Sequence, residues 1–441
     1  MAHQKNQPDP ALFERISDTI WDYAEPRFRE VKSAGLLSKA LEDHGFSVER
    51  GIAGLSTAFC ASFGSGSPVI AVLGEYDALP GLSQERDAAE RRTAAGRTCG
   101  HGCGHHLIGT GAAEAAVRIK NYLQETGRAG TIRYYGCPAE EGGSGKIFMI
   151  RAGCFDDVDA CFAWHPSGFN GVWDTCLASV RVMYHFRGVS AHAAACPHKG
   201  RSALDAAELM NIGVNFLREH VTPDVRLHYA FINAGGVQPN IVPDTVDIVH
   251  VARADSIQTV QELYDRLQKM AQGAALMTET QVSSRVQLSY YSFLPNGPLE
   301  KLVARHLREE TVAYTEEEIR YGDRFGAESN ILRKKDLFAA QAISGSTDVA
   351  DVSWVVPTVQ VASVCGATDA LHSWQFTAQG CSSIAHKGMH FAAGVIARSA
   401  MTLYSEPERL SAIRDFWEAE KQGAIYRSLL PEDLTPEELQ K

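Results

Sequence analysis

Residues that could bind a divalent metal ion surround an adjacent pair of glutamates in this chain. The pair, Glu140 and Glu141, follows a strand-like run at 131–135. Thiolate, imidazole and carboxylate groups together suit zinc or manganese. A second glutamate beside a ligand is what a metal-dependent hydrolase requires, because one carboxylate holds metal while the other moves a proton. The candidate ligands elsewhere in the chain are Cys103, His105, His165 and His372.

Each of these residues alone is weak evidence for a site. A histidine at a strand end more often has a structural role, and adjacent glutamates are common on protein surfaces. Their joint placement is more informative, because each one ends an apolar run or lies in a glycine-rich turn. Cys103 and His105 lie in the glycine-rich stretch 99–106, and His165 ends the apolar run 160–164. These are the positions at which α/β enzymes place functional groups.

The elements that must position these residues alternate between helices and strands. Helical spacing of apolar residues is expected at 10–25, 28–45 and 107–126. Strand-like runs are expected at 56–63, at 68–74, before Glu140 and before His165. Polar residues collect just past the ends of these strands. The pattern indicates an α/β sheet with its functional site at one edge.

The order of the expected elements changes in the middle of the chain. Strands are expected at 178–187, 225–233, 245–253 and 280–293, and helices at 203–220 and 256–277. The order β-α-β-β-α-β is that of a ferredoxin-like module. The α/β pattern resumes near Leu299. We therefore expect a discontinuous catalytic domain at 1–175 and 294–441, with a second domain inserted at 176–293.

Size and composition argue against several classes of protein. A chain of 441 residues favours two domains. The net charge of -11, without an offsetting cluster of lysine or arginine, argues against a nucleic-acid partner. No membrane association is expected either, since no apolar run approaches the length of a bilayer span and the N-terminus lacks the core of a signal peptide. The ten cysteines are scattered among apolar runs, which favours a reducing, cytoplasmic location.

Longer motifs carry a resemblance that extends along essentially the whole chain. These motifs occupy 74–80, 136–146, 346–354, 371–375 and 385–389. The chain resembles the co-catalytic metallopeptidase family ("M-twenty") that includes aminoacylase and carboxypeptidase G. It is similar to the amidohydrolase branch, which uses Cys-Gly-His, here residues 103–105, in place of the peptidases' His-x-Asp motif. The resemblance implies an α/β catalytic domain with a mixed sheet and an inserted ferredoxin-like α+β lid domain that forms a dimer.

The resemblance also implies roles for the residues of the metal site. Glu140 would be the general base, which takes a proton from water and delivers it to the leaving nitrogen. Asp77 would orient a metal ligand, a task that such sites require. Two divalent ions, Mn²⁺ or Zn²⁺, would be bound in each chain, with Cys103 as the bridging ligand. The implied ligands are Cys103, His105, Glu141, His165 and His372.

The inserted domain is expected to contribute three polar groups. By resemblance, His192 would reach the active site of the partner protomer and stabilise the tetrahedral oxyanion. Asn240 and Arg253 would hold the carboxylate of the substrate, a task that suits a planar guanidinium. One departure from the close relatives is His106, which stands where they have asparagine. We expect His106 to pack or to orient other residues, and metal ligation from the same short turn is the alternative.

The resemblance implies hydrolysis of the linear amide bond of an N-acyl or N-aroyl acidic amino acid. The leading substrate is p-aminobenzoyl-glutamate, and the alternatives are indole-3-acetyl-aspartate, another aromatic-acyl amino acid or a small dipeptide. The expected assembly is a homodimer through the inserted domain, with a paralogous chain as an additional candidate partner. Outside the enzyme class, the alternative is a non-catalytic partner chain that binds amides, against which the intact Glu140 argues. A structural metal protein would instead need closed coordination and no spare carboxylate.

Overall fold

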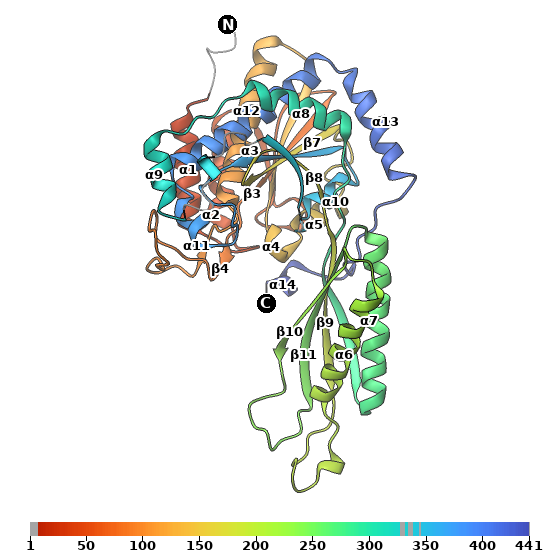
Figure 1. Cartoon of the computed structure of the whole chain (residues 1–441). Helices are drawn as coiled ribbons and strands as arrows, with labels where there is room; N and C mark the ends of the chain where they lie inside the picture. Colours follow the sequence, from red (N-terminus) through yellow and green to blue (C-terminus); the bar gives the residue numbers. More distant parts are fainter. Residues whose placement is uncertain (1–7, 327–330, 334–337, 344, 441) are drawn as a thin grey trace.

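The computed structural model describes residues 8–326, 331–333, 338–343 and 345–440 (Figure 1). The chain forms a large unit around an eight-stranded sheet and a smaller unit that projects from it. Among the described residues, no helix combines the length and the apolar composition that a membrane span requires.

The large unit is built on a mixed sheet with the strand order β1-β2-β6-β3-β7-β14-β8-β13. The four adjacent strands β6, β3, β7 and β14 are parallel, so their carboxyl ends meet at one edge. Strand β3 is buried along its whole length, as expected for the centre of such a sheet. The strands are β1 (Ser47–Arg50), β2 (Phe59–Ser65), β3 (Val69–Glu75), β6 (Gly130–Cys137), β7 (Ala160–Ser167), β8 (Asn170–Cys176), β13 (Phe338–Ile343) and β14 (Thr358–Val364).

Helices pack on both faces of this sheet. One apolar core lies between the sheet and the first five helices named below, and a second core on the opposite face continues into the smaller unit. The helices of the first face are α1 (Pro10–Tyr23), α2 (Val31–Asp43), α3 (His105–Thr126), α8 (Gly297–Glu309) and α12 (Ser383–Ser405), with α13 (Arg409–Lys421) packed on α8. Shorter elements are β4 (Leu79–Pro80), β5 (Cys99–Gly100), α4 (Glu140–Gly143), α5 (Gly145–Arg151), α9 (Glu316–Asp323), α10 (Val349–Ser353), α11 (Trp374–Gln379) and α14 (Pro436–Leu439).

Helix α3 packs unusually close to the sheet because glycine occupies the contact. A Cβ atom added at Gly109 would lie 2.6 Å from the carbonyl oxygen of Glu75 at the end of β3. The helix begins after Gly104, whose φ of 79° belongs to the left-handed region that favours glycine. These two glycines bring the first residues of α3 against the carboxyl ends of the central strands, which is where the candidate site lies.

The smaller unit contains the six elements expected for a ferredoxin-like module. They are β9 (Ala178–Arg187), α6 (Ala203–Leu217), β10 (Arg226–Asn233), β11 (Thr245–Ala254), α7 (Ile257–Thr278) and β12 (Gln281–Tyr290). The sheet order is β10-β11-β9-β12, with antiparallel pairs throughout. Two of these elements end earlier in the chain than the sequence predicts. Helix α6 stops at Leu217 and is followed by a 3₁₀ turn, and β12 stops at Tyr290.

The two helices cover only one face of the smaller sheet. Alternate residues of β9, from Ala178 to Phe186, are buried under α6 and α7, while those between them point to the open face. The segment after α13 crosses from the large unit and ends in α14, which lies where the two units meet (Figure 1). Arg285 of β12 pairs there with Asp433 and Glu438.

Candidate metal centre

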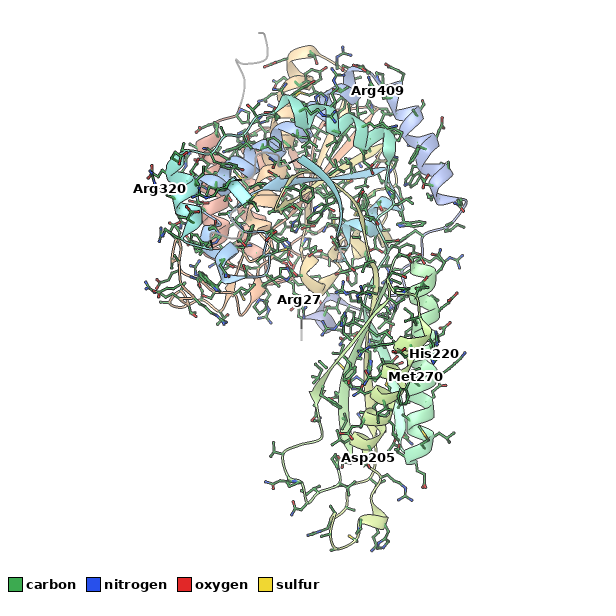
Figure 2. The ribbon with its side chains drawn as sticks, viewed as in Figure 1. Arg27, Asp205, His220, Met270, Arg320 and Arg409 are labelled. Atoms are coloured by element: carbon green, nitrogen blue, oxygen red, sulfur yellow. The ribbon has the colours of Figure 1, made fainter. Side chains whose placement is uncertain are left out.

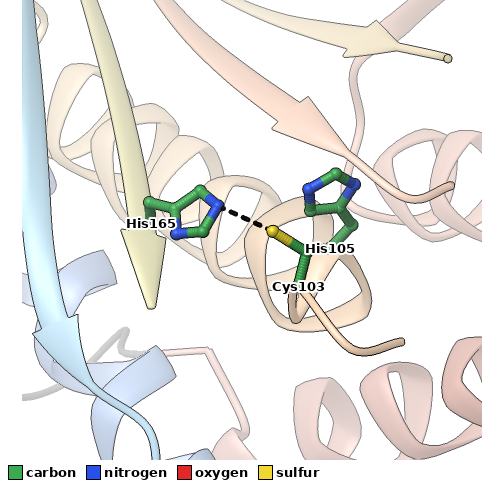
Figure 3. A group of neighbouring side chains, drawn as sticks. All are labelled: Cys103, His105 and His165. Atoms are coloured by element: carbon green, nitrogen blue, oxygen red, sulfur yellow. Dashed lines mark hydrogen bonds between the residues drawn. The ribbon is translucent and has the colours of Figure 1, made fainter. Parts of the chain in front are cut away.

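Residues from separate parts of the chain converge at the carboxyl edge of the large sheet. Figure 3 shows Cys103, just before α3, with its thiol directed at His165 of β7, and His105 beside it at the start of the helix. Ligand atoms of these three residues lie within 4.8 Å of one another. Cys103, Glu141 and His372 form a second such group, and His105 with Glu140 and Glu141 forms a third. The structure therefore brings all five expected ligands together.

Cys103 lies at the centre of the cluster. Its Sγ atom is 3.3 Å from Nε2 of His165 and 3.3 Å from Nε2 of His372. Nε2 of His372 lies 3.1 Å from Oε1 of Glu141 on the other side. The thiol belongs to two of the three ligand groups, as do His105 and Glu141, so these three residues connect the groups into one cluster.

Two buried atoms in this cluster make no hydrogen bond within the described part of the chain. They are Nε2 of His105 and Oε1 of Glu141, and the latter has the nearby ring nitrogen of His372 for a neighbour of opposite character. Leaving buried polar atoms unpaired is costly, and a divalent cation would satisfy both. Burial, followed by the charge of Glu141, raises the pKa of the Cys103 thiol, so a cation is also what would favour its thiolate form. The donor set and its unsatisfied atoms fit a pair of divalent metal ions.

Hydrogen bonds prepare both buried imidazoles for a metal. Nδ1 of His105 donates to Oδ1 of Asp77 at 2.8 Å, and Nδ1 of His165 donates to the carbonyl oxygen of Pro166 at 2.8 Å. In a neutral ring this arrangement leaves the lone pair on Nε2, the atom that can bind a metal. Burial lowers the pKa of His165 to about 4, which keeps that ring neutral. Oδ2 of Asp77 also accepts from the backbone N–H of Glu141 at 2.9 Å.

The turn that carries Glu140 and Glu141 is held in an uncommon conformation. Ala139, just before it, has a φ of 59°, and its N–H donates to the buried carboxylate of Glu30 at 2.9 Å. The hydroxyl of Tyr290, at the end of β12, donates to the carbonyl oxygen of Glu140 at 3.1 Å. His372 also has a positive φ, of 58°. Left-handed backbone at residues other than glycine is typical of functional sites, where surrounding contacts hold the strain.

The surroundings of Glu140 weaken its acidity. Burial raises the pKa of Glu140 well above its ordinary value, and the charges of Glu75 and Glu141 raise it further. A carboxyl whose pKa is raised in this way can accept a proton from water and later donate it. The neighbouring Glu141 shares the same turn, but its backbone is fixed through Asp77. The two adjacent glutamates therefore have different surroundings.

A buried ion cluster beneath the site was missed by the sequence reasoning. Nζ of Lys146 lies 2.5 Å from Oε1 of Glu75 and 2.6 Å from Oδ1 of Asp348, and all three side chains are buried. Burial alone would lower the pKa of Lys146, but the charges of Asp348 and Glu75 raise it well above its usual value. Oε2 of Glu75 lies 3.5 Å from Nε2 of His105. Glu75 ends an apolar strand just as a candidate ligand would, so a sequence signal for it existed.

His106 points away from the metal ligands. Its Nε2 donates to the carbonyl oxygen of Gly380 at 2.9 Å, and its ring packs beside that of His101. Burial, followed by the charge of His101, lowers the pKa of His106 well below its usual value. His106 is absent from the three ligand groups among the described residues. The contacts fit the packing role that was expected.

The structure does not bring the polar groups of the smaller unit to the metal ligands. His192 and Asn240 lie in neighbouring exposed loops after β9 and β10, where the N–H of Ala193 donates to the carbonyl oxygen of Asn240. These loops form the tip of the smaller unit, far from the large sheet (Figure 1). Arg253 lies at the opposite end of β11, where it donates to the hydroxyl of Ser346 at 2.8 Å.

Comparisons with known proteins agree with these observations. No family model matches the chain. The chain is 42% identical to one of the two named subunits of the p-aminobenzoyl-glutamate hydrolase of Escherichia coli, over 98% of this chain and 97% of that protein. It is 32% identical to the Xaa-Arg dipeptidase of Mus musculus, over 90% and 87%. It is 30% identical to the indole-3-acetyl-aspartic acid hydrolase of Enterobacter agglomerans, over 45% of each chain.

Two solved structures share the fold. One is a dinuclear metal-binding peptidase of the M20 family from Bacillus subtilis, with a TM-score of 0.62 and 18% identity over 90% of this chain and 99% of that one. The other is an aminobenzoyl-glutamate utilization protein from Klebsiella pneumoniae, with a TM-score of 0.61 and 17% identity over 89% and 95%. The expected family and fold class are thereby confirmed. The chain belongs to the amidohydrolase branch of the M20 metallopeptidase family, together with its Escherichia coli relative of 42% identity.

Proposed function

We propose that this chain hydrolyses the amide bond of an N-acyl or N-aroyl acidic amino acid, with p-aminobenzoyl-glutamate as the leading substrate. The observation that carries the proposal is Glu140, a spare carboxylate of raised pKa beside the five clustered ligands. A binding protein or a structural metal site has no need of such a group. The relative with 42% identity, named for p-aminobenzoyl-glutamate, supports the choice of substrate.

Two divalent ions, Mn²⁺ or Zn²⁺, would be held by Cys103, His105, Glu141, His165 and His372. When bound, they would supply Lewis-acid activation of water and of the amide carbonyl. The contribution of the chain is to position and to move protons. Asp77 keeps Nε2 of His105 available and fixes the backbone of Glu141. Glu140 accepts the proton of the attacking water and delivers it to the leaving nitrogen.

The remaining groups act from the smaller unit, residues 176–293, which we propose to be a lid and dimerisation domain. Its tip carries His192 and Asn240, which are too far from the metal ligands of their own chain to act there. We propose that His192 and Asn240 act across the dimer interface, where His192 stabilises the oxyanion in the partner's site. There Asn240 would hold the substrate's carboxylate together with Arg253 from the root of the other protomer's lid. A second copy of this chain is the first candidate partner. A paralogous chain is the second, because the Escherichia coli hydrolase is named with two different subunits and both are similar to this chain.

Other relatives define the alternative substrates. Indole-3-acetyl-aspartate has the same kind of acidic amino acid with a different aromatic acyl group, and a relative is named for its hydrolysis. The dipeptidase relative is named for substrates that end in arginine, the opposite charge. We also propose a cytoplasmic location, supported by ten cysteines that all remain free thiols.

The test is a panel of acyl-amino acids assayed with chelated protein to which Mn²⁺ or Zn²⁺ is added back. We expect turnover of p-aminobenzoyl-glutamate, loss on chelation and recovery with metal. Elemental analysis should find two transition-metal ions per active chain. Activity confined to arginine-ending dipeptides would contradict the substrate, and active protein with one ion or none would contradict the two-metal site.

A further inference from the structure

The open face of the lid sheet carries two arginines close to the catalytic turn. Arg253 of β11 and Tyr290 of β12 both pair with Ser179 of β9, and Arg181 lies two residues further along β9. Side chains directly paired, or two residues apart on one strand, point to the same face. The helices α6 and α7 cover the opposite face, so Arg181 and Arg253 project from the face away from these helices, at the root of the lid.

A third arginine approaches from the large unit. Arg27 lies in the turn after α1, and Figure 2 shows it at the edge of the large unit that faces the lid. Its Nη1 atom donates to the carbonyl oxygen of Glu141 at 3.3 Å. Tyr290 contacts the adjacent carbonyl oxygen, that of Glu140. Arg27, Arg181 and Arg253, which we call the arginine cluster, therefore adjoin the turn that carries the catalytic carboxylates.

The arginine cluster has no acid to neutralise it within the described residues. None of the three forms an ion pair there, and the buried Nε of Arg181 has no hydrogen-bond partner. Burial lowers the pKa of Arg181, and the nearby charge of Arg27 lowers it further. Other partly buried arginines are matched, such as Arg118 with Glu114 and Arg133 with Asp157.

Partly buried cations that lie close together without a counter-charge are unfavourable unless an anion binds between them. The chain has a net charge of -11, so acidic partners were abundant in its composition. An external anion is the partner that the surroundings of Arg181 lack. A guanidinium with free N–H groups suits a carboxylate, which it can bind with two parallel hydrogen bonds.

We propose that Arg181, assisted by Arg27, forms a subsite for the side-chain carboxylate of the acidic amino acid in the substrate. This inference rests on the proposed function and deepens it. An N-acyl glutamate or aspartate carries two carboxylates, and Arg253 with Asn240 accounts for one. Arg181 projects beside Arg253 on the same face, so the second carboxylate has a cation within reach of the first. The same charges would repel a basic side chain.

The test compares p-aminobenzoyl-glutamate with p-aminobenzoyl-glutamine, which has nearly the same shape without the second charge. For Arg181→Met, kcat/KM for the glutamate compound should fall about 10- to 100-fold, the scale of a lost charged hydrogen bond, mainly through KM. The glutamine compound should change less than about 3-fold, because it never formed the charge pair that the variant removes. Arg266→Met, at an arginine of α7 that contacts the carbonyl oxygen of His220, should leave kcat/KM for both compounds unchanged. Equal losses for both compounds would overturn the subsite.

Arg27→Met provides a second variant should Arg181→Met fail to fold, with the same selectivity and a smaller loss of about 3- to 10-fold expected. Equal effects of Arg27→Met on both compounds would count against the subsite. Binding separates this inference from the proposed function. Calorimetry with metal-loaded Glu140→Gln protein measures affinity for p-aminobenzoyl-glutamate without turnover. If wild-type protein hydrolyses no compound of the panel, the proposed function fails, and an affinity that still depends on Arg181 supports the subsite. An affinity that Arg181→Met leaves unchanged overturns it.

Discussion

Asp77 joins two parts of the metal centre through its two carboxylate oxygens. One accepts from Nδ1 of His105 and the other from the backbone of Glu141. We expect Asp77→Asn to lower metal affinity by about 10- to 100-fold, because the amide can present a donor where the imidazole needs an acceptor. Competition with a chromogenic chelator measures this affinity directly. Unchanged affinity would mean that Asp77 does not orient the ligands.

Glu140 is expected to be needed for turnover and not for metal binding. Glutamine keeps the shape of the side chain and removes its ability to accept a proton. Glu140→Gln should therefore lower kcat by about 100-fold or more, with the metal content of wild-type protein. Steady-state kinetics and elemental analysis on the same sample check both parts. Near-normal turnover at normal metal content would exclude Glu140 from the chemistry.

Single residues were predictable where chain position alone indicated them. His165 and the glutamate pair end apolar runs, and parallel strands deliver such ends to one edge of a sheet. Lys146 has no such signal, because its partner Asp348 lies 202 residues away in sequence. The uncompensated charge of Arg181 was equally hidden, since a lack of partners is a property of packing. Sequence thus indicated the ligands and left out the charges that surround them.

Three helices of the large unit meet at a histidine whose charge should stabilise them. His390 of α12 contacts Glu114 of α3 at 2.6 Å through Nδ1 and Glu14 of α1 at 3.3 Å through Nε2. Burial alone would lower the pKa of His390, but its hydrogen bond with Glu114 and the charges of both acids raise it. The folded chain therefore binds the proton more tightly than the unfolded chain, whose histidine has a pKa near 6.5.

The resulting stability is fully present below about pH 6.5 and is lost as the pH rises through the higher pKa of the folded state. We expect His390→Gln to lower the free energy of unfolding by about 1 kcal/mol at pH 6, discounted for partial exposure, and by less at pH 9. Urea unfolding at both pH values measures the difference. His220→Gln, at an exposed histidine, is the matched control for replacing a histidine. A larger loss at pH 9 than at pH 6 would contradict the assignment.

Elements were predictable where apolar periodicity was strong. Strand β9 was expected at its observed bounds, and the order of the lid elements is as expected. The ends of elements were less accurate, since β6 stops at Cys137, three residues before the expected end at Glu140. Pro138 explains part of this difference, because proline cannot donate to a strand ladder. The freed backbone then forms the left-handed turn that presents the two glutamates.

At the scale of the whole molecule, the groups proposed for catalysis lie at opposite ends of the lid. The ligands and Arg253 are at its root, whereas His192 and Asn240 are at its tip. The edge strand β10 exposes Tyr229, Phe231 and Ile232, apolar side chains that a second lid could cover. The sequence could indicate the lid as a module. Its assembly depends on contacts between two chains, which the pattern of one chain does not specify. Sharing of sites between protomers therefore needs an experiment on mixed dimers.

Complementation between two inactive chains tests whether His192 acts across the dimer. His192→Ala and Glu140→Gln chains are each expected to be inactive alone, and are mixed under conditions that exchange protomers. In a mixed dimer, one site would have lost both groups and the other would keep both. Half of the dimers mix statistically and each has one intact site of two, so up to about a quarter of native activity should return. The matched control mixes His192→Ala chains with chains that carry both His192→Ala and Glu140→Gln. It should restore no activity, because neither site of such a mixed dimer has both groups. No recovery in the first mixture, with exchange demonstrated by mass-labelled protomers, would mean that His192 serves its own chain or takes no part.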